Sequence, residues 1–144
     1  MSRSAREILE AAKVVAVVGA SRDPGKPSGH IPYILQHRGF RIIPVNPNAD
    51  EILGERTYAS LLDIQEPVDV VDVFRPAAEA PGIARQAVAM GARALWLQFG
   101  IKSDEARSIA EAAGLDYVED LCMGRTSVKL NIASTPKMRL VRQP

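Results

Sequence analysis

Five short apolar runs, separated by stretches with helical spacing, constrain the fold of this chain more than any other feature. The runs cover residues 14–18, 40–45, 68–74, 94–98 and 115–118. Nearly continuous apolar runs of this length are typical of strands in a parallel sheet that helices cover on both faces. The stretches between them predict helices over residues 28–38, 58–64, 78–90 and 103–113, with a leading helix over about 4–12. The pattern predicts an α/β fold, a single Rossmann-like doubly wound parallel sheet of about five strands with helices on both faces.

The length of the chain and the order of its elements fit one domain. A chain of 144 residues is large enough for one ordinary domain and too small for two. We therefore expect a single domain over residues 1–144, with the common strand order 3-2-1-4-5. Trp96 alternates with leucines inside the fourth run, so we expect it in the core. The residues after Val118 show no clear pattern, and we expect a flexible tail from about residue 131.

Composition and charge exclude several classes of function. The formal net charge is +1, which argues against a protein that binds nucleic acid or a membrane surface through its overall charge. Cys122 is the only cysteine and His30 and His37 are the only histidines, so we expect no internal disulfide and no metal site. No apolar run approaches the ~18 residues of a membrane-spanning helix, and the amino terminus lacks the pattern of a signal peptide. We therefore expect a cytoplasmic protein.

The loop after the first strand is the first candidate for a binding site. In open α/β sheets, ligands bind beyond the carboxyl ends of the strands, where the strand order reverses. Gly19 permits a turn there, Ser21 offers a hydroxyl group, and the helix that begins near Ser28 offers unpaired N–H groups to an anion. Arg22 and Lys26 add positive charge. We interpret this segment as a phosphate-binding loop; the alternative is an ordinary turn between a strand and a helix.

Two familiar nucleotide-binding motifs do not fit this loop. The dinucleotide-binding motif G-x-G-x-x-G would place glycines where Ser21 and Pro24 stand. The P-loop motif requires a serine or threonine after its lysine, whereas Pro27 follows Lys26. A phosphate site in this loop would therefore be of neither type.

The end of the second strand distinguishes among nucleotide cofactors. NAD-binding domains place an aspartate or glutamate there to accept hydrogen bonds from the ribose hydroxyls. Here Val45, Asn46 and Pro47 end the strand, and the first carboxylate after them is that of Asp50. The missing carboxylate suits a phosphorylated ribose, which both coenzyme A and NADP carry. An ordinary Asn-Pro-Asn turn is the alternative.

Further candidate residues follow the third and fourth strands. Phe74 could lie along an adenine ring while Arg75 meets a phosphate. The alternative is a core phenylalanine beside a surface arginine that caps the turn. Gln98, Phe99 and Gly100 follow the fourth strand at the same edge, and Gly100 would let a ligand pass close to the backbone.

Five motifs, in order along the chain, resemble those of a known family. They are Val-Val-Gly-Ala-Ser-Arg-Asp-Pro (17–24, followed by Lys26 and Ser28), Pro-Val-Asn-Pro (44–47), Asp-Val-Val-Asp-Val-Phe-Arg-Pro (69–76), Trp-Leu-Gln-Phe-Gly (96–100) and Asp-Leu-Cys-Met (120–123). The resemblance covers residues 14 to about 130. The chain resembles the small stand-alone CoA-binding proteins, which are similar to the CoA-binding domain of the succinyl-CoA synthetase α subunit and of ADP-forming acyl-CoA synthetases.

The resemblance implies that coenzyme A, or an acyl-CoA, binds across the carboxyl ends of the strands. It places Gly19, Ala20, Ser21 and Arg22 at the phosphates with Lys26 as a further partner, and Val45, Asn46 and Pro47 beside the nucleotide. It places Phe74 and Arg75 on the other side, and Gln98, Phe99 and Gly100 along the path to the pantetheine arm. The chain departs from the family after Cys122, at residues 123–126, so the resemblance assigns no contacts to that segment.

The resemblance implies binding without catalysis. The larger synthetases are enzymes because further domains supply a phosphorylated histidine and a nucleotide-grasp site, and this sequence contains neither domain. No G-x-S-x-G motif is present, and we expect His30 and His37 to be ordinary helix histidines. We therefore predict no catalytic residues and a small-molecule partner, with a protein partner or a second copy left open. The alternatives are an NADP-dependent oxidoreductase domain and an accessory subunit of a separately encoded acyl-CoA synthetase.

Cys122 follows the fifth strand at the edge where the thiol end of coenzyme A would emerge. A mixed disulfide between the two thiols is one hypothesis for this residue. The alternative is a buried structural cysteine that acts as a small apolar side chain.

Overall fold

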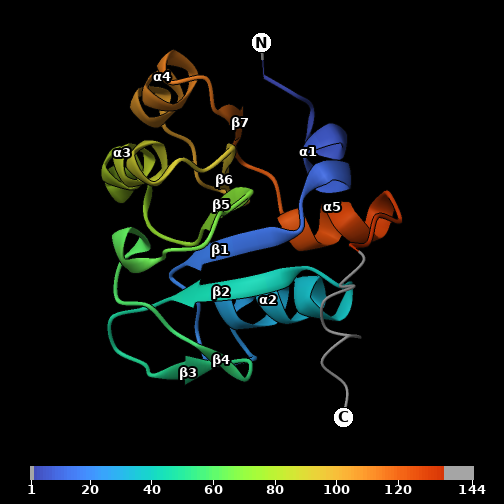
Figure 1. Cartoon of the computed structure of the whole chain (residues 1–144). Helices are drawn as coiled ribbons and strands as arrows, with labels where there is room; N and C mark the ends of the chain where they lie inside the picture. The colour runs from blue at the N-terminus through green and yellow to red at the C-terminus, as the bar shows by residue number, and fades with distance from the viewer. Residues whose placement is uncertain (1, 135–144) are drawn as a thin grey trace.

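A five-stranded parallel sheet forms the centre of the structure (Figure 1). The structure, a computed structural model, describes residues 2–134 of the chain. The strands of the sheet are β1 (Val14–Val18), β2 (Arg41–Val45), β5 (Val70–Val73), β6 (Ala94–Leu97) and β7 (Asp116–Val118). Every pair of neighbours is parallel. The predicted fold class, an α/β fold built on a doubly wound parallel sheet, is confirmed.

Helices cover both faces of this sheet (Figure 1). On one face lie α1 (Ala5–Ala11), α2 (Pro27–His37) and α5 (Met123–Lys129), and on the other lie α3 (Ala80–Met90) and α4 (Asp104–Ala112). The side chains of β1 alternate between the two layers. Val15 and Val17 belong to the core beneath α1, α2 and α5, and Ala16 belongs to the core beneath α3 and α4. Because both faces are buried, the strands are apolar at nearly every position.

Local signals in the sequence set the ends of several helices. Ser4 accepts a hydrogen bond from the Glu7 N–H, and the Glu7 carboxylate accepts one from the Ser4 N–H, which forms a capping box at the start of α1. The Ser103 hydroxyl caps α4 by accepting the Ala106 N–H. The helices predicted over residues 4–12, 28–38, 78–90 and 103–113 are confirmed to within two residues at each end.

The strand order differs from the prediction. The observed order is β2-β1-β5-β6-β7, so the predicted order 3-2-1-4-5 was wrong. β5, the third long strand, pairs with β1 on the side away from β2. Pro44 lies inside β2 and has no N–H to donate, and a proline at such a position suits an edge strand. Its carbonyl accepts a hydrogen bond from the Tyr58 N–H rather than from a further long strand.

The connection from β2 to β5 contains a hairpin over residues 51–56, and most of the helix predicted over residues 58–64 does not form. Its elements are β3 (Glu51–Ile52), β4 (Glu55–Arg56) and the 3-10 turn η1 (Leu61–Asp63); a second 3-10 turn, η2 (Ala77–Glu79), precedes α3. β3 and β4 pair antiparallel in a sheet of their own. Tyr58, at which the predicted helix would begin, instead forms an isolated bridge with Val45 of β2. That prediction was therefore correct only for the single turn of η1.

The short helix α5 was not predicted. Its N-cap is Cys122, whose Sγ atom accepts the Arg125 N–H at 3.4 Å, and cysteine is not among the common N-cap residues. Gly124 lets α5 approach α2 closely, because a Cβ atom at this position would lie 2.9 Å from Cγ2 of Ile31. The helix therefore owes its position to tertiary packing rather than to a strong local pattern.

The tail predicted from about residue 131 falls mostly outside the described residues, which end at 134. Ile132 is buried, and its carbonyl accepts a hydrogen bond from Nε of Arg38 at 3.1 Å. The Ser134 N–H donates to the Arg38 carbonyl at 2.9 Å. Residues 131–134 are thus attached to the end of α2.

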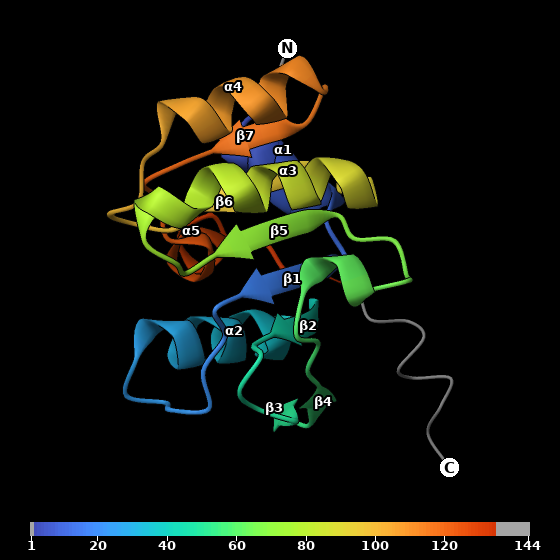
Figure 2. The ribbon, with the colours of Figure 1, turned by 90° about the vertical axis from the view of Figure 1, so that its left-hand side faces the viewer.

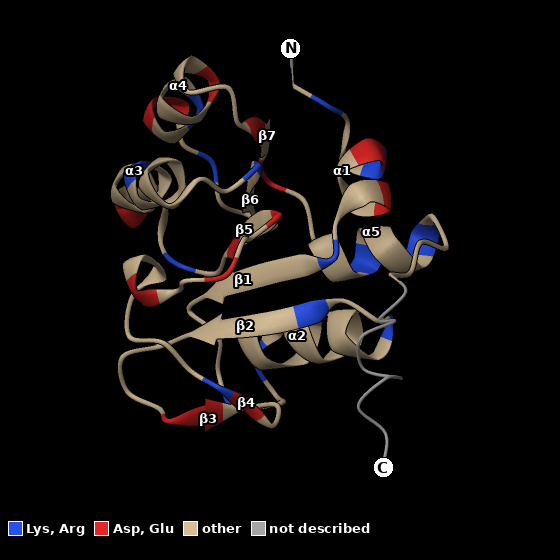
Figure 3. Cartoon of the chain, in the orientation of Figure 1, with Lys and Arg blue, Asp and Glu red and all other residues tan. Residues whose placement is uncertain are grey.

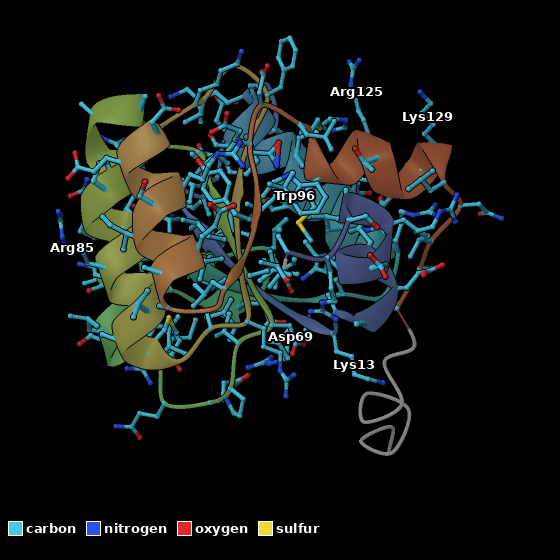
Figure 4. All side chains as sticks on the ribbon, turned by 90° about the horizontal axis from the view of Figure 1, so that it is seen from above. Lys13, Asp69, Arg85, Trp96, Arg125 and Lys129 are labelled. Atoms are coloured by element: carbon cyan, nitrogen blue, oxygen red, sulfur yellow. The ribbon has the colours of Figure 1, made fainter. Side chains whose placement is uncertain are left out.

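Trp96 lies in the interior of the protein, as predicted (Figure 4). Its side chain is fully buried in the layer beneath α1, α2 and α5. Its Nε1–H donates a hydrogen bond of 2.8 Å to the Leu121 carbonyl, which satisfies the one polar group of the ring.

Candidate functional site

The carboxyl ends of the strands lie along one edge of the sheet, and the strand order creates a switch point there between β1 and β5 (Figure 2). The chain leaves β1 toward β2 on one side and leaves β5 toward β6 on the other. Doubly wound sheets of this order bind ligands at that point. Two adjacent cavities are present at this edge.

The first, which we call the rim cavity, has a volume of about 590 Å³. It brings together the loops that follow β1, β2 and β5. Ten predicted site residues line it: Gly19, Ala20, Ser21, Lys26, Ser28, Val45, Asn46, Pro47, Phe74 and Arg75. Glu79, Ile83 and Gln86 also line it and were not predicted, because only the observed order, with β5 beside β1, brings the start of α3 to this place.

The loop from β1 to α2 is held in shape by its own hydrogen bonds. The Ser21 hydroxyl accepts the Asp23 N–H at 3.0 Å, and Oδ1 of Asp23 accepts the Gly25 N–H at 2.8 Å. The Ser21 N–H donates to the Ser28 carbonyl at 3.0 Å, which ties the loop to the start of α2. The Ser28 N–H makes no hydrogen bond to any described residue. A free N–H at the positive end of a helix favours an anion such as a phosphate.

Two glycines let the backbone pack closely around this loop. Gly19 has a φ of +88°, and a Cβ atom there would lie 2.9 Å from the Phe74 carbonyl oxygen. Gly29 packs against the loop from the first turn of α2. A Cβ atom on Gly29 would overlap the carbonyl oxygen of Asp23 and lie 3.0 Å from that of Ser21. Neither glycine can carry a side chain unless the loop moves.

Asn46 connects the loops that follow β1 and β2. Its Nδ2 atom donates to the Ala20 carbonyl at 2.9 Å, and its Oδ1 atom accepts the Asn48 N–H at 2.7 Å. The second bond is the side-chain turn that the sequence offered as the alternative to a ribose contact. The Asn46 side chain therefore shapes the wall of the rim cavity beside Val45 and Pro47.

Arg75 lies at the rim with a carboxylate partner. Its Nε and Nη2 atoms donate to Glu79 at 3.0 and 2.7 Å, and 47% of each side chain is exposed. The hydrogen bond from Arg75 lowers the pKa of Glu79. The rim cavity thus contains two cations, Lys26 and Arg75, and the carboxylate of Glu79.

The second cavity, which we call the apolar groove, has a volume of about 730 Å³. Lys26, Ser28 and Phe74 line both this groove and the rim cavity, so the two cavities are adjacent. The other residues that line it are Pro24, Gly25, Pro27, His30, Ile31, Ile34, Gln98, Phe99, Ile101, Cys122 and Arg125. The predicted residues Gln98 and Phe99 are therefore brought together with Phe74, and 77% of Phe99 is exposed.

The first turn of α5 also faces the apolar groove, although the sequence assigned no contacts to it. Cys122 and Arg125 line the groove, and Arg125 projects outward from the helix (Figure 4). The charged residues of α5 are both basic, Arg125 and Lys129 (Figure 3). Among the described residues, no carboxylate lines the apolar groove. Its charge is therefore positive, supplied by Lys26 and Arg125.

A buried pair of polar side chains lies at the apolar groove, which Gln98 lines and Asp72 does not. Gln98 is 4% exposed, and its Nε2 atom donates to Oδ1 of Asp72 at 2.8 Å. Asp72 is completely buried, and its Oδ2 atom has no partner among the described residues. Burial raises the pKa of Asp72 well above its usual value, and the hydrogen bond from Gln98 offsets only part of this rise. Sequence reasoning missed Asp72, and the available signal was a carboxylate inside an otherwise apolar strand.

Two predicted residues lie elsewhere. Arg22 lines neither the rim cavity nor the apolar groove; it lines a neighbouring cavity of about 450 Å³ together with Tyr33 and Glu51. Gly100 forms a turn beside Phe99 with a φ of +87°, and its N–H donates to Oδ1 of Asp120 at 2.7 Å. The backbone of Gly100 is thus engaged in fixing the loop after β6.

The histidines lie on α2, as expected, and both are exposed. Nδ1 of His37 lies 3.2 Å from the Tyr33 carbonyl oxygen. Within residues 2–134, no three side chains of the types that bind metals are grouped to hold an ion. None of the helices in this part of the chain has the length and the apolar character to cross a membrane.

Residues 13–127 match a family described as the CoA binding domain. The matched segment contains all five strands of the main sheet. It also contains the residues that line the rim cavity and the apolar groove.

Two relatives and one solved structure place the match in context. The chain is 38% identical over 118 residues to the uncharacterized protein YneT of Bacillus subtilis, with 82% of this chain and 87% of that protein covered. It is 40% identical over 101 residues to the ADP-forming acetate–CoA ligase II of Archaeoglobus fulgidus, with 69% of this chain and 15% of the ligase covered. Cell-free ID.343 from Thermus thermophilus has a similar structure, with a TM-score of 0.83 and 38% identity over 87% of this chain and 95% of that one.

Proposed function

Because this chain belongs to the CoA binding domain family, we propose that it binds coenzyme A or an acyl-CoA at the carboxyl edge of its sheet and catalyses no reaction of its own. The observation that carries this proposal is the pair of adjacent cavities that share Lys26, Ser28 and Phe74. One cavity is polar and the other is mostly apolar. The ligand has the same two parts, a phosphorylated nucleotide and a long uncharged arm.

The rim cavity suits the nucleotide. Lys26 and the free N–H of Ser28 at the start of α2 offer charge and a hydrogen-bond donor to the phosphates. The end of β2 supplies Asn46 and Pro47 instead of a carboxylate, which suits a ribose that bears a 3′-phosphate. Arg75 is the cation that we assign to this phosphate, and binding would require it to exchange or share its partner Glu79.

The apolar groove suits the pantetheine arm, which is largely aliphatic and carries no charge. Its walls include Ile31, Ile34, Phe74 and Ile101. Burial of such an arm is favourable by roughly 25 cal/mol for each Å² of apolar surface removed from water. Cys122 and Arg125 also line the groove, and we place the thiol or an acyl group beside them.

The hydrogen bonds of two side chains in these cavities, the Ser21 hydroxyl and the Cys122 thiol, are consistent with binding without catalysis. An activated nucleophile needs a base within hydrogen-bond reach. The Ser21 hydroxyl accepts the Asp23 N–H, and Sγ of Cys122 accepts the Arg125 N–H. Among the described residues, neither side chain is hydrogen-bonded to a histidine or to a carboxylate.

Isothermal titration of the ligand-free protein tests the proposal. We expect coenzyme A to bind in the micromolar range, and 3′-dephospho-CoA to bind about tenfold more weakly because a charge-assisted hydrogen bond is lost. NAD and NADP, titrated at the same salt concentration, are expected to bind more weakly than coenzyme A. Binding of NADP without binding of coenzyme A would contradict the proposal and favour an oxidoreductase domain. The absence of detectable binding by any of the four ligands would contradict it as well.

A matched pair of variants extends the same titration to the 3′-phosphate. Arg75→Ala is expected to weaken coenzyme A about fivefold and to leave 3′-dephospho-CoA unchanged. Glu79→Gln removes the competing carboxylate, so its affinity for coenzyme A should be equal to or higher than that of the unsubstituted protein. Equal losses for both ligands in Arg75→Ala would show that Arg75 does not meet the 3′-phosphate.

The mixed-disulfide hypothesis for Cys122 also has a direct test. Cys122 is partly buried and lines the apolar groove. Its thiolate would attack oxidised coenzyme A, form one Cys122–CoA disulfide and release one CoA thiolate. We expect intact-mass spectrometry after incubation with oxidised coenzyme A to show one adduct, and Cys122→Ser to show none. An adduct on the serine variant, or no adduct on the unsubstituted protein, would refute the hypothesis.

A further inference from the structure

The position of Asp72 is unusual for a carboxyl group. It lies in the middle of β5, where its partners in the two neighbouring strands are Val17 and Trp96, both completely buried. Burial of a carboxyl group in such surroundings costs free energy unless its oxygens are hydrogen-bonded. Phe74, two residues further along the chain, lies on the same face of the sheet and lines the apolar groove. Asp72 is therefore one layer beneath the groove.

The group that Asp72 contacts is the carboxamide of Gln98. The backbone of Gln98 is fixed, because its N–H donates to the Val73 carbonyl at 3.2 Å and its carbonyl accepts the Ile101 N–H at 3.0 Å. The bond from Nε2 to Asp72 is the one side-chain hydrogen bond that Gln98 makes among residues 2–134. With Nε2 directed down to Asp72, the amide oxygen of Gln98 remains without a partner in a residue that lines the groove.

The surroundings of Gln98 show which ligand group this oxygen would serve. Ile31, Phe74 and Ile101 form apolar walls of the same groove. A hydrogen-bond acceptor on the floor of an apolar groove selects for a ligand that brings a donor, because an unpaired polar group in such a place is costly. A pantetheine arm brings donors of this kind, the N–H groups of its amides.

We propose that Asp72 is a positioning residue for ligand selection: it orients Gln98 so that the amide oxygen accepts an N–H of the pantetheine arm. The inference rests on the proposed function, since it takes coenzyme A as the ligand. Asp72 itself does not touch the ligand. The effect of Asp72 on binding passes through Gln98, which distinguishes ligands with a pantetheine arm from those that have only the nucleotide.

Titration with two ligands tests this role, with coenzyme A as one and adenosine 3′,5′-bisphosphate, which lacks the arm, as the other. Gln98→Leu is expected to weaken coenzyme A about fivefold and to change the bisphosphate by less than about twofold. Asp72→Val, which removes the acceptor for Nε2, is expected to give the same pattern. Asp72→Asn keeps an oxygen in the place of Oδ1 and is expected to bind both ligands like the unsubstituted protein.

The double variant Asp72→Val with Gln98→Leu separates positioning from an independent effect. If Asp72 acts through Gln98, the double variant binds coenzyme A no more weakly than Gln98→Leu alone. Multiplied losses would overturn the inference, as would unchanged coenzyme A affinity in either single variant. Equal losses for both ligands in Asp72→Val would show a merely structural role. The near-ultraviolet circular dichroism of Trp96, the neighbour of Asp72 in β6, reports whether each variant has kept its core.

The same experiment separates this inference from the proposed function. If the unsubstituted protein binds adenosine 3′,5′-bisphosphate but not coenzyme A, both the proposed function and the role of Asp72 are refuted. If it binds coenzyme A and the substitutions at Asp72 and Gln98 have no effect, only the present inference is refuted.

Discussion

Replacement of Gly29 by alanine is expected to destabilise the protein by about 3 kcal/mol and to abolish coenzyme A binding. A Cβ atom at this position would overlap the carbonyl oxygen of Asp23 and lie 2.8 Å from its carbonyl carbon. Both atoms belong to the backbone, so no side-chain rotation can relieve the overlap. The loop must move away from α2, and with it the Ser21 N–H that donates to the Ser28 carbonyl. The proposed phosphate site, Lys26 and the free N–H of Ser28, lies in this same loop and helix start.

Urea unfolding and calorimetric titration of Gly29→Ala measure the two effects, and Gly82 provides the control. Gly82 lies in α3, and a Cβ atom there meets nothing within 4 Å. Gly82→Ala is therefore expected to raise stability by roughly 0.5–1 kcal/mol, as alanine does in a helix, and to leave binding unchanged. Normal coenzyme A affinity in Gly29→Ala would show that the close contact between the loop and α2 is not needed for the site.

Asp72→Asn is expected to stabilise the protein by an amount that increases with pH. An aspartate in the unfolded chain has a pKa of about 3.9, whereas burial raises the pKa of Asp72 in the folded state. Between these two values the folded state holds a proton that the unfolded state has lost, so stability falls as pH rises. The loss is about 1.4 kcal/mol for each pH unit until the folded pKa is reached, and asparagine does not titrate.

The measurement is the difference in unfolding free energy between Asp72→Asn and the unsubstituted protein, from urea titrations between about pH 5 and about pH 8. All other groups titrate alike in the two proteins, so they cancel from the difference. A difference that does not change over this range would mean that Asp72 has an ordinary pKa in the folded state. The same variant is expected to bind coenzyme A normally, so that stability and binding respond differently to one substitution.

The strands could be predicted from the sequence because each is a short apolar run, but their order could not be predicted from the runs alone. The two orders differ in the partner of the third strand, which pairs with β2 in the predicted order and with β1 in the observed one. Pro44 was the local signal, since its missing N–H favours an edge position for β2. This error did not separate the predicted residues that follow β1 from those that follow β2, because in either order these two strands are parallel neighbours.

The parts of the site that were missed depend on tertiary packing. Glu79 reaches the rim cavity only because β5 lies beside β1. Arg125 reaches the apolar groove because Gly124 lets α5 pack against α2. Arg22 follows Ser21 directly, yet the turn sends it into a different cavity. Proximity along the chain therefore predicted that this loop lines a cavity, but not the direction of each of its side chains.

The covered border of β2 has a consequence for how this protein behaves in a concentrated solution. An open border of a sheet is a template on which strands of other molecules can add, and aggregation often begins there. Pro44 offers no N–H on this border, and Tyr58 bonds to it from outside. At the opposite border, the Tyr117 N–H of β7 donates to Ser2 Oγ, and the Arg3 N–H donates to Asp116. Because the chain itself bonds to part of each border, growth of the sheet from one molecule into the next is disfavoured.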